Sequence, residues 1–302
     1  MSNTSSLSRF APIAAAALGV GFLSMMDAFM KEAALTTGTY TATVLRALIG
    51  ASLIAPVWLW RKRGWPARAT MMLHLERGII SAFMALSFFY ALTKLPLAEA
   101  IAISFIAPLV ALYFARVLLG EEIQPSAIFA SLIGFTGTLV IVGGKIGDGD
   151  FDEDVALGLA SLLFSALLYA YNFVVIRRQS QLAGPIEVAT FHSGVSGAVL
   201  LLFAPFLATP LLPEALPLLF AAGLLTVAGA MAIAWAYARA EAQVLVPIEY
   251  SGFLWASVLG WAFFREEVTL PTIAGTALIV TGCWIATRKQ PDAKAATQGE
   301  KA

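Results

Sequence analysis

The sequence predicts an all-α polytopic membrane protein in which ten transmembrane helices form two inverted five-helix repeats. Composition indicates the membrane, because 59% of the 302 residues are hydrophobic, only 13% are charged, and the mean hydropathy is +0.82. A soluble domain carries about 25% charged residues. Spacing indicates the repeat, because Glu121 and Gly137 recur 145 residues later as Glu266 and Gly282 without a gap. Each copy holds five apolar runs. Since five is odd, the second copy must enter the membrane from the opposite side, as in many secondary transporters.

Ten apolar segments are long enough for a helix to cross about 30 Å of hydrocarbon, which takes roughly 20 residues. In chain order they are 11–30, 41–60, 78–94, 97–119, 126–144, 155–176, 186–208, 215–238, 243–264 and 270–287. The first segment has only Arg9 before it and runs directly into Lys31 and Glu32. We therefore interpret it as a membrane span and not as a cleaved signal peptide.

Two of the connecting stretches are distinctive. Residues 61–77 are basic and amphipathic, which favours a position along the inner membrane surface. Residues 145–154 contain alternating aspartates, but Glu153 and Leu159 occupy the positions where a calcium-binding EF-hand needs Gly and Glu. We interpret this acidic stretch as a solvated linker.

These segments predict four regions along the chain. They are the first repeat at 11–144, an extracytoplasmic linker at 145–154, the second repeat at 155–288 and a cytoplasmic tail at 289–302.

Basic residues are distributed unequally between the two predicted sides. With a cytoplasmic N-terminus, 14 Lys and Arg residues fall inside and four fall outside. This bias predicts a multi-pass protein of the cell inner membrane with both termini in the cytoplasm. The net charge is zero, which argues against a nucleic-acid partner.

Small residues recur at helical spacing on the last segment of each copy. Ala130, Gly134 and Thr138 repeat every fourth position, and Gly275 and Gly282 are a heptad apart. Small faces let helix backbones approach closely in lipid. Whether that contact lies within one chain or between two copies stays open.

The stretch 120–125, followed by Ala130, resembles the end of an EamA repeat, and so does 266–269, followed by Gly275. Arg265 replaces the glycine that precedes the second glutamate pair. Two such units are similar to a ten-helix member of the drug/metabolite transporter superfamily, and the resemblance covers nearly the whole chain. It implies export of amino acids and related metabolites, and the aromatic amino-acid exporters are among the proteins it resembles.

Charged groups inside spans are costly, so each is a functional candidate. Asp27 and Arg46 lie at similar predicted depths near the outer ends of the first two segments, as a gate or a structural ion pair. Lys31, four residues after Asp27, is an alternative partner for that carboxylate. His192 and Asn172 lie near the inner ends of theirs. His192 is either a titrating group or a neutral histidine hydrogen-bonded between helices.

Two prolines predict breaks in spanning helices. Pro247 precedes Glu249, so freed carbonyls and a carboxylate would meet there, and Pro108 makes a similar break beside Ser104 and Phe105. Interrupted helices near the midplane are where transporters place substrate sites. A bare hinge without ligand contact is the alternative at each.

Aromatic residues supply the apolar part of the predicted binding site. The candidates besides Phe105 are Tyr90, Tyr169, Trp235, Tyr250 and Phe253. An apolar cavity lined by rings with a few polar anchors suits neutral or aromatic amino acids. Packing against other helices or anchoring at the membrane interface is the alternative role for most of them.

Several function classes are disfavoured. Only one Lys or Arg, Arg46, lies well within a span, which disfavours a phosphorylated cargo. No G-x-x-x-x-G-K-[ST] loop is present, and the single cysteine, Cys283, allows neither an intramolecular disulfide nor a zinc cluster. We predict no cofactor and no metal site.

The leading hypothesis is an exporter of amino acids and related metabolites that works by alternating access. Efflux of cationic drugs, using Glu249 as the counter-charge, is an alternative. A membrane-embedded enzyme is a weaker one. The sequence leaves the coupling ion, the preferred side chain and the oligomeric state open.

Overall fold

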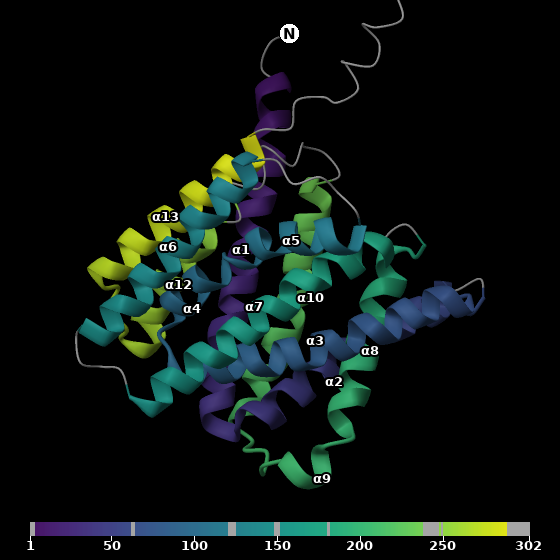
Figure 1. Ribbon diagram of the computed structural model, residues 1–302. Coiled ribbons are helices and arrows are strands. Elements are labelled where there is room, and N and C mark those ends of the chain that lie inside the picture. The colour runs from purple at the N-terminus through teal and green to yellow at the C-terminus, as the bar shows by residue number, and fades with distance from the viewer. Residues whose placement is uncertain are drawn as a thin grey trace, which may run out of the picture.

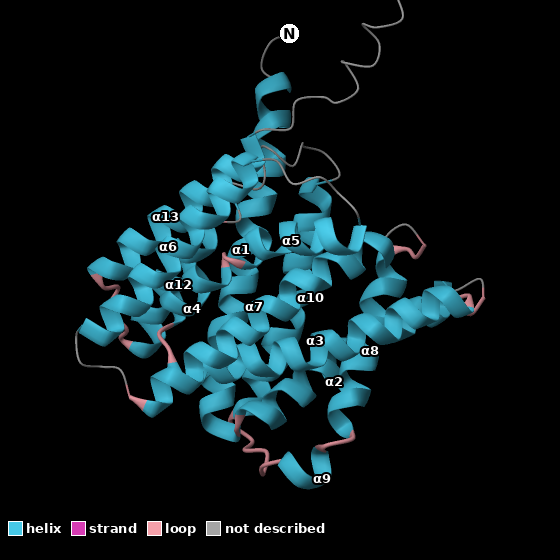
Figure 2. Ribbon diagram, in the orientation of Figure 1, coloured by secondary structure: helices cyan, strands magenta, loops and turns pink. Residues whose placement is uncertain are grey.

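The described part of the chain is helical throughout. The computed structural model describes residues 4–61, 64–119, 125–147, 152–179, 182–237, 248 and 250–288, and no strand occurs among them (Figure 2). The helices of the first half are α1 (Thr4–Thr37), α2 (Thr39–Arg61), α3 (Arg68–Lys94), α4 (Leu97–Ser104), α5 (Ala107–Leu119) and α6 (Pro125–Gly147). Those of the second half are α7 (Glu153–Gln179), α8 (Pro185–Leu201), α9 (Ala204–Leu207), α10 (Ala215–Tyr237), α12 (Ser251–Phe264) and α13 (Leu270–Arg288).

The predicted fold class is confirmed. Within the described ranges, six segments are long and apolar enough to cross a membrane, and four shorter helices are also apolar. Each of the ten predicted segments overlaps one of them. The fourth contains the expected interruption, because α4 ends at Ser104 and α5 begins at Ala107, directly before Pro108. The beginning of the ninth predicted segment lies outside the described residues.

Two boundaries differ from the sequence prediction. α1 runs past the predicted end at residue 30 as far as Thr37, because the charge of Lys31 is compensated by Glu266 and does not end the helix. The stretch 61–77 does not lie along the surface as a separate element, since Arg68 already begins α3. In this stretch His74, Glu76 and Arg77 form hydrogen bonds with side chains of α7 and α8.

The helix contacts of one half recur between the equivalent helices of the other. α1 packs on α10, and the equivalent pair 145 residues away, α7 and α3, also packs together. The contact of α3 with α8 has its equivalent in α10 with α2. α2 with α8 and α6 with α13 each join a helix to its own counterpart, and α12, the counterpart of α5, packs on α4. The repeat seen in the sequence is therefore a repeat of contacts.

The small residues of α6 and α13 meet within one chain. A Cβ on Gly137 would lie 2.5 Å from the carbonyl oxygen of Gly275, and a Cβ on Gly275 would lie 2.5 Å from the carbonyl oxygen of Gly137. Such a close approach leaves no room for a side chain at either of these two positions. Figure 1 shows the two helices side by side at one edge of the molecule. The question left open by the sequence is decided in favour of an intrachain contact.

The turn between α1 and α2 depends on a glycine. Gly38 has φ +88, and a Cβ there would lie 2.6 Å from Oγ1 of Thr209. The hydroxyl of Thr209 donates to the carbonyl of Thr37, and the backbone N–H of Thr209 donates to Oγ1 of Thr41 at 2.9 Å. These contacts fasten the C-terminal end of α1 and the N-terminal end of α2 to the loop that precedes α10.

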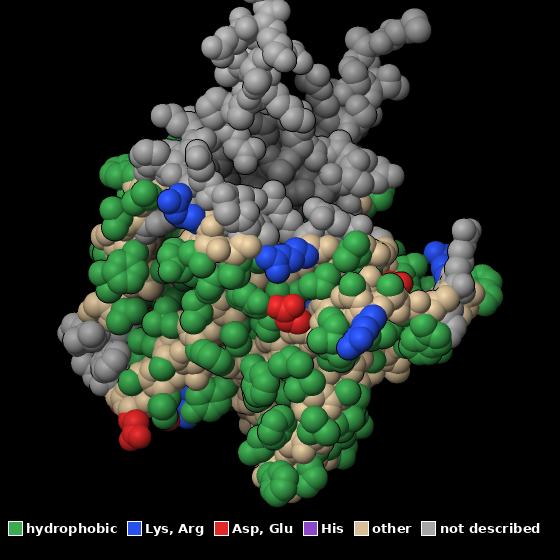
Figure 3. Space-filling model, turned by 45° about the vertical axis from the view of Figure 1, so that its right-hand side comes forward, with side chains coloured by type: hydrophobic (Ala, Val, Ile, Leu, Met, Phe, Trp, Pro, Cys, Tyr) green, Lys and Arg blue, Asp and Glu red, His purple; other side chains and the backbone are tan. Residues whose placement is uncertain are grey.

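The surface is apolar over most of one face (Figure 3). Trp60, Trp65 and Phe206 are 83%, 68% and 85% exposed. Such exposure is costly in water and is expected where lipid or the membrane interface is the solvent.

Candidate functional site

A cavity lies between the halves, at about the middle of the spans. α2 and α3 of the first half and α8 and α10 of the second half supply its walls. The lining residues are Thr43, Arg46, Ala47, Ser81, Ala82, Met84, Ala85, His192, Ser193, Ser196, Leu200 and Thr226. Ser81 and Thr226 are the central residues of α3 and α10. The interface between repeats near the midplane is the usual position of a transporter's substrate site.

Three buried polar atoms of this lining have no hydrogen-bond partner. They are Nε of Arg46, Oγ of Ser81 and Nδ1 of His192. Unsatisfied buried polar atoms are costly in a folded protein and are therefore rare outside functional sites. Their gathering in one cavity gives it unused capacity for binding a polar group.

Arg46 is held without a direct ion pair. Its guanidinium lies 5.1 Å from the centroid of the Phe89 ring, in a cation–π contact. Asp27 is near enough to interact with it electrostatically, but the ion pairs of the described residues do not include these two. The sequence prediction of matching depth is supported by this proximity, and the gating or ion-pair role stays a prediction.

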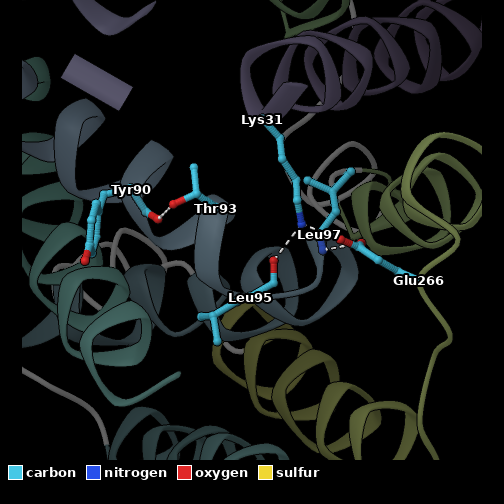
Figure 4. Close-up of polar contacts among 6 residues, drawn as sticks. All are labelled: Lys31, Tyr90, Thr93, Leu95, Leu97 and Glu266. Atoms are coloured by element: carbon cyan, nitrogen blue, oxygen red, sulfur yellow. Dashed lines mark hydrogen bonds and ion pairs between the residues drawn. The ribbon is translucent and has the colours of Figure 1, made fainter. Parts of the chain in front are cut away.

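Near the C-terminal end of α1, Lys31 is buried against the second half of the chain (Figure 4). Its ammonium group forms an ion pair with Oε1 of Glu266 and donates to the carbonyl of Leu95 at 2.8 Å. The backbone N–H of Leu97, at the start of α4, donates to Oε2 of Glu266 at 2.7 Å. Glu266 therefore caps α4 and neutralises Lys31 at once. Lys31 is not paired with Asp27, because its side chain reaches the loop between α12 and α13.

A second polar network joins α3 to α7 and α8 on the opposite side of the cavity. The His74 ring is fully buried, with Nε2 3.1 Å from Oε1 of Glu187 and Nδ1 2.6 Å from Nε2 of Gln179. Arg77 donates to Oε1 of Gln179 at 2.8 Å. The ring also stacks on Phe191, with centroids 4.4 Å apart and an interplanar angle of 10°. Within the described residues, no group of three or more His, Cys, Asp or Glu side chains is arranged to hold a metal ion.

The structure brings together two of the aromatic residues that the sequence predicted for substrate binding. The rings of Phe105 and Tyr250 meet edge to face, with centroids 5.3 Å apart and an interplanar angle of 82°. Ser104 donates its hydroxyl to the carbonyl of Ala100 at 2.8 Å within α4, and Phe253 packs against the core beside them. This cluster lies at the contact of α4 with α12, and none of its members lines the cavity.

The remaining predicted residues are dispersed. Tyr90 is partly buried on α3, while Tyr169 and Trp235 are each 41% exposed. Asn172 is buried on α7, with an Oδ1 that has no hydrogen-bond partner. Glu249 lies outside the described residues. The role of each in substrate binding or gating stays a prediction.

Similarity to known proteins follows the repeat. The EamA-like transporter family matches residues 10–143 and again 156–288. The chain belongs to this family. It is a membrane transporter of the EamA type in the drug/metabolite transporter superfamily, as the sequence motifs indicated.

Relatives of this EamA-type transporter carry different cargoes. The pseudopaline exporter CntI of Pseudomonas aeruginosa is 28% identical over 263 residues, which are 86% of this chain and 90% of the relative. The aromatic amino acid exporter YddG of Ancylobacter novellus is 30% identical over 111 residues, 36% of this chain and 38% of the relative. A solved crystal structure with 21% identity and a TM-score of 0.60 covers 91% of this chain and 99% of its own, and so supports the fold.

The His74 network of this EamA-type transporter was missed by sequence reasoning. His74 and Arg77 belong to the stretch 61–77, whose basic and amphipathic character predicted a position along the membrane surface. A usable signal exists, because the two positions are three apart and share a helix face that continues into the apolar segment. Gln179 and Glu187 carry no comparable signal, since their importance comes only from packing against α3.

Proposed function

We propose that this EamA-type transporter exports amino acids and related small metabolites from the cytoplasm by alternating access. The observation that carries the proposal is the cavity whose walls come from both halves of the chain. A site of this kind opens to either side when one half rocks against the other. The repeats at 11–144 and 155–288 would be the moving units.

The orientation proposed is that of an inner-membrane protein with both termini in the cytoplasm. The bias of 14 basic residues against four supports it. Figure 3 shows Lys and Arg mostly in its upper part, toward the end at which α1 begins in Figure 1. The Lys31–Glu266 network would then close the outer side of the cavity, and the His74 network its inner side.

A cationic drug fits this cavity less well. Among the described lining residues the one formally charged side chain is the cation Arg46, and none is a carboxylate. A cation entering low-dielectric surroundings beside a guanidinium is repelled. The alternative would need Glu249, outside the described residues, to supply the counter-charge.

Uptake into proteoliposomes tests the function directly. Vesicles holding the purified protein are given radiolabelled phenylalanine, alanine or the cation ethidium, and protein-free vesicles provide the background. We expect saturable movement of an amino acid and none of ethidium. Ethidium movement without amino-acid movement would overturn the proposal.

Alternating access has its own test. Cys283 is the single cysteine of the chain, so Cys283→Ser gives a background in which Ala85→Cys reports on the cavity. A membrane-impermeant maleimide should modify this cysteine from either side of the membrane, and a transported amino acid should change the ratio of the two rates. Labelling from one side only, with and without substrate, would contradict alternating access.

A further inference from the structure

Arg46 is the strongest anchor for an anion in the cavity. A guanidinium in the membrane interior is costly unless its charge is compensated. Asp27 lies near but forms no ion pair with it. The Phe89 ring, 5.1 Å from the guanidinium carbon, compensates the charge in part. Nε retains an unused donor in the cavity.

The geometry of this contact matters for what Arg46 can bind. A cation–π contact attracts the guanidinium without using a carboxylate or carbonyl acceptor, and the N–H groups of the guanidinium donate in its plane. A carboxylate accepts two such N–H bonds side by side, which makes the pair both strong and oriented. The contact with Phe89 is therefore compatible with a carboxylate at the guanidinium edge.

Hydroxyl groups on α2, α8 and α10 offer acceptors to the cavity. Oγ1 of Thr43 donates to the carbonyl of Thr39 at 2.7 Å, and Oγ1 of Thr226 donates to the carbonyl of Ala222 at 2.7 Å. Ser196 donates to the carbonyl of Gly78 at 3.0 Å. Because each hydroxyl proton is already used, these oxygens present only lone pairs to a ligand. Lone pairs suit the N–H donors of an ammonium group.

We infer, on the basis of the proposed export function, that Arg46 binds the carboxylate of the exported molecule while the cavity hydroxyls accept from its ammonium group. Ser81 Oγ and His192 Nδ1, which have no partner, supply further hydrogen bonds to the same head group. The substrate class is then the α-amino acids and other zwitterions with a free carboxylate. This assignment concerns the head group and leaves the side chain of the substrate to be recognised by other residues.

The experiment compares four probes that differ only in the head group. L-Phenylalanine has both charges, L-phenylalaninamide and phenethylamine lack the carboxylate, and 3-phenylpropionate lacks the ammonium. Each unlabelled probe competes with radiolabelled phenylalanine for uptake into proteoliposomes of the wild-type protein. Each is also added to the purified protein in detergent, where a ligand of the native state raises the melting temperature.

We expect the two probes without a carboxylate to bind on the order of tenfold to hundredfold more weakly than phenylalanine, the range for losing a charged hydrogen bond. 3-Phenylpropionate should rank between them and phenylalanine. Arg46→Gln should raise the half-saturation concentration for phenylalanine by a similar factor and abolish the discrimination against the amide. Arg46→Lys, which keeps the charge but not the planar fork, should lie between.

Arg116→Gln is the matched control. Arg116 is exposed on α5, so this substitution removes the same charge at a position away from the cavity. It should leave the ranking unchanged. Equal competition by phenylalanine and its amide in the wild-type protein would overturn the inference without any variant. So would an Arg46→Gln protein that folds and still discriminates. If no amino acid moves or stabilises the protein, the proposed function itself fails, and the inference fails with it.

Discussion

Neutralising Lys31 should destabilise the fold, because its ammonium group is buried beside Glu266. The side chains of Lys31 and Glu266 are only 6% and 16% exposed, so water screens the pair little. Removing one member of a buried ion pair leaves the other uncompensated and costs about 3–5 kcal/mol. For Lys31→Met we expect about 3 kcal/mol, the lower end of that range, because the Leu97 N–H still stabilises the remaining carboxylate.

Glu266→Gln separates the two contacts of this carboxylate. The amide oxygen still accepts from the Leu97 N–H, so this variant reports on the ion pair. Glu266→Ala also removes the cap of α4 and should cost about 1 kcal/mol more. The measurement is the free energy of reversible unfolding in mixed micelles titrated with SDS. The double variant Lys31→Met/Glu266→Gln should be less destabilised than the sum of its single variants by at least about 1 kcal/mol.

Lys94 provides the control for this cycle. It pairs with Asp154 at 2.7 Å, but the two side chains are 26% and 62% exposed. Exposed pairs contribute little, because water and salt screen them. Lys94→Met should therefore leave the unfolding free energy unchanged. Strictly additive effects of the Lys31 and Glu266 variants, or a Lys31→Met protein as stable as Lys94→Met, would refute the reasoning.

Three further outcomes can be checked by the same unfolding measurement. Gly137→Ala should cost about 1–3 kcal/mol, since its Cβ would press on the backbone of α13, whereas Gly143→Ala on the same helix meets no atom within 4 Å and should be neutral. Gly38→Ala should cost about 1–2 kcal/mol because its φ of +88 disfavours a side chain. Gly64→Ala, with open space and no positive φ, is its control, and equal effects would contradict the argument. His74→Phe keeps the stacking but leaves Nε2 of the buried Gln179 without its His74 partner and removes the contact to the partly buried Glu187, so a loss of about 1–3 kcal/mol is expected, and an unchanged stability would show the network to be dispensable.

Span positions could be predicted from the sequence because the bilayer fixes how many apolar residues a helix needs. The same counting gave Asp27 and Arg46 matching depths, and the two do interact. Depth alone does not fix the rotation of each helix about its axis. For that reason the sequence could not show that Arg46 faces a cavity, or that Asp27 and Arg46 form no ion pair with each other.

Contacts between the halves were beyond the reach of sequence patterns. Glu266 was recognised as part of a family motif, but its partner Lys31 lies 235 positions away, so neither residue indicates the other. The sequence offered Asp27 only as an alternative partner for Lys31, because spacing indicates local neighbours alone. The sequence did not indicate the role of His74 for a related reason. The basic residues around it predict a position at the membrane surface, and His74 is buried only because α7 and α8 pack against α3.

The ring contact between Phe105 and Tyr250 has an evolutionary consequence. The two residues are 145 positions apart, so each is the other's equivalent in the repeat, and their rings touch. If the five-helix unit once existed as a separate gene product, this position faced its own copy across a homodimer of opposed subunits. A single mutation then changed both rings together. Gene fusion freed the two positions to diverge, and the pair now carries a hydroxyl on one side alone.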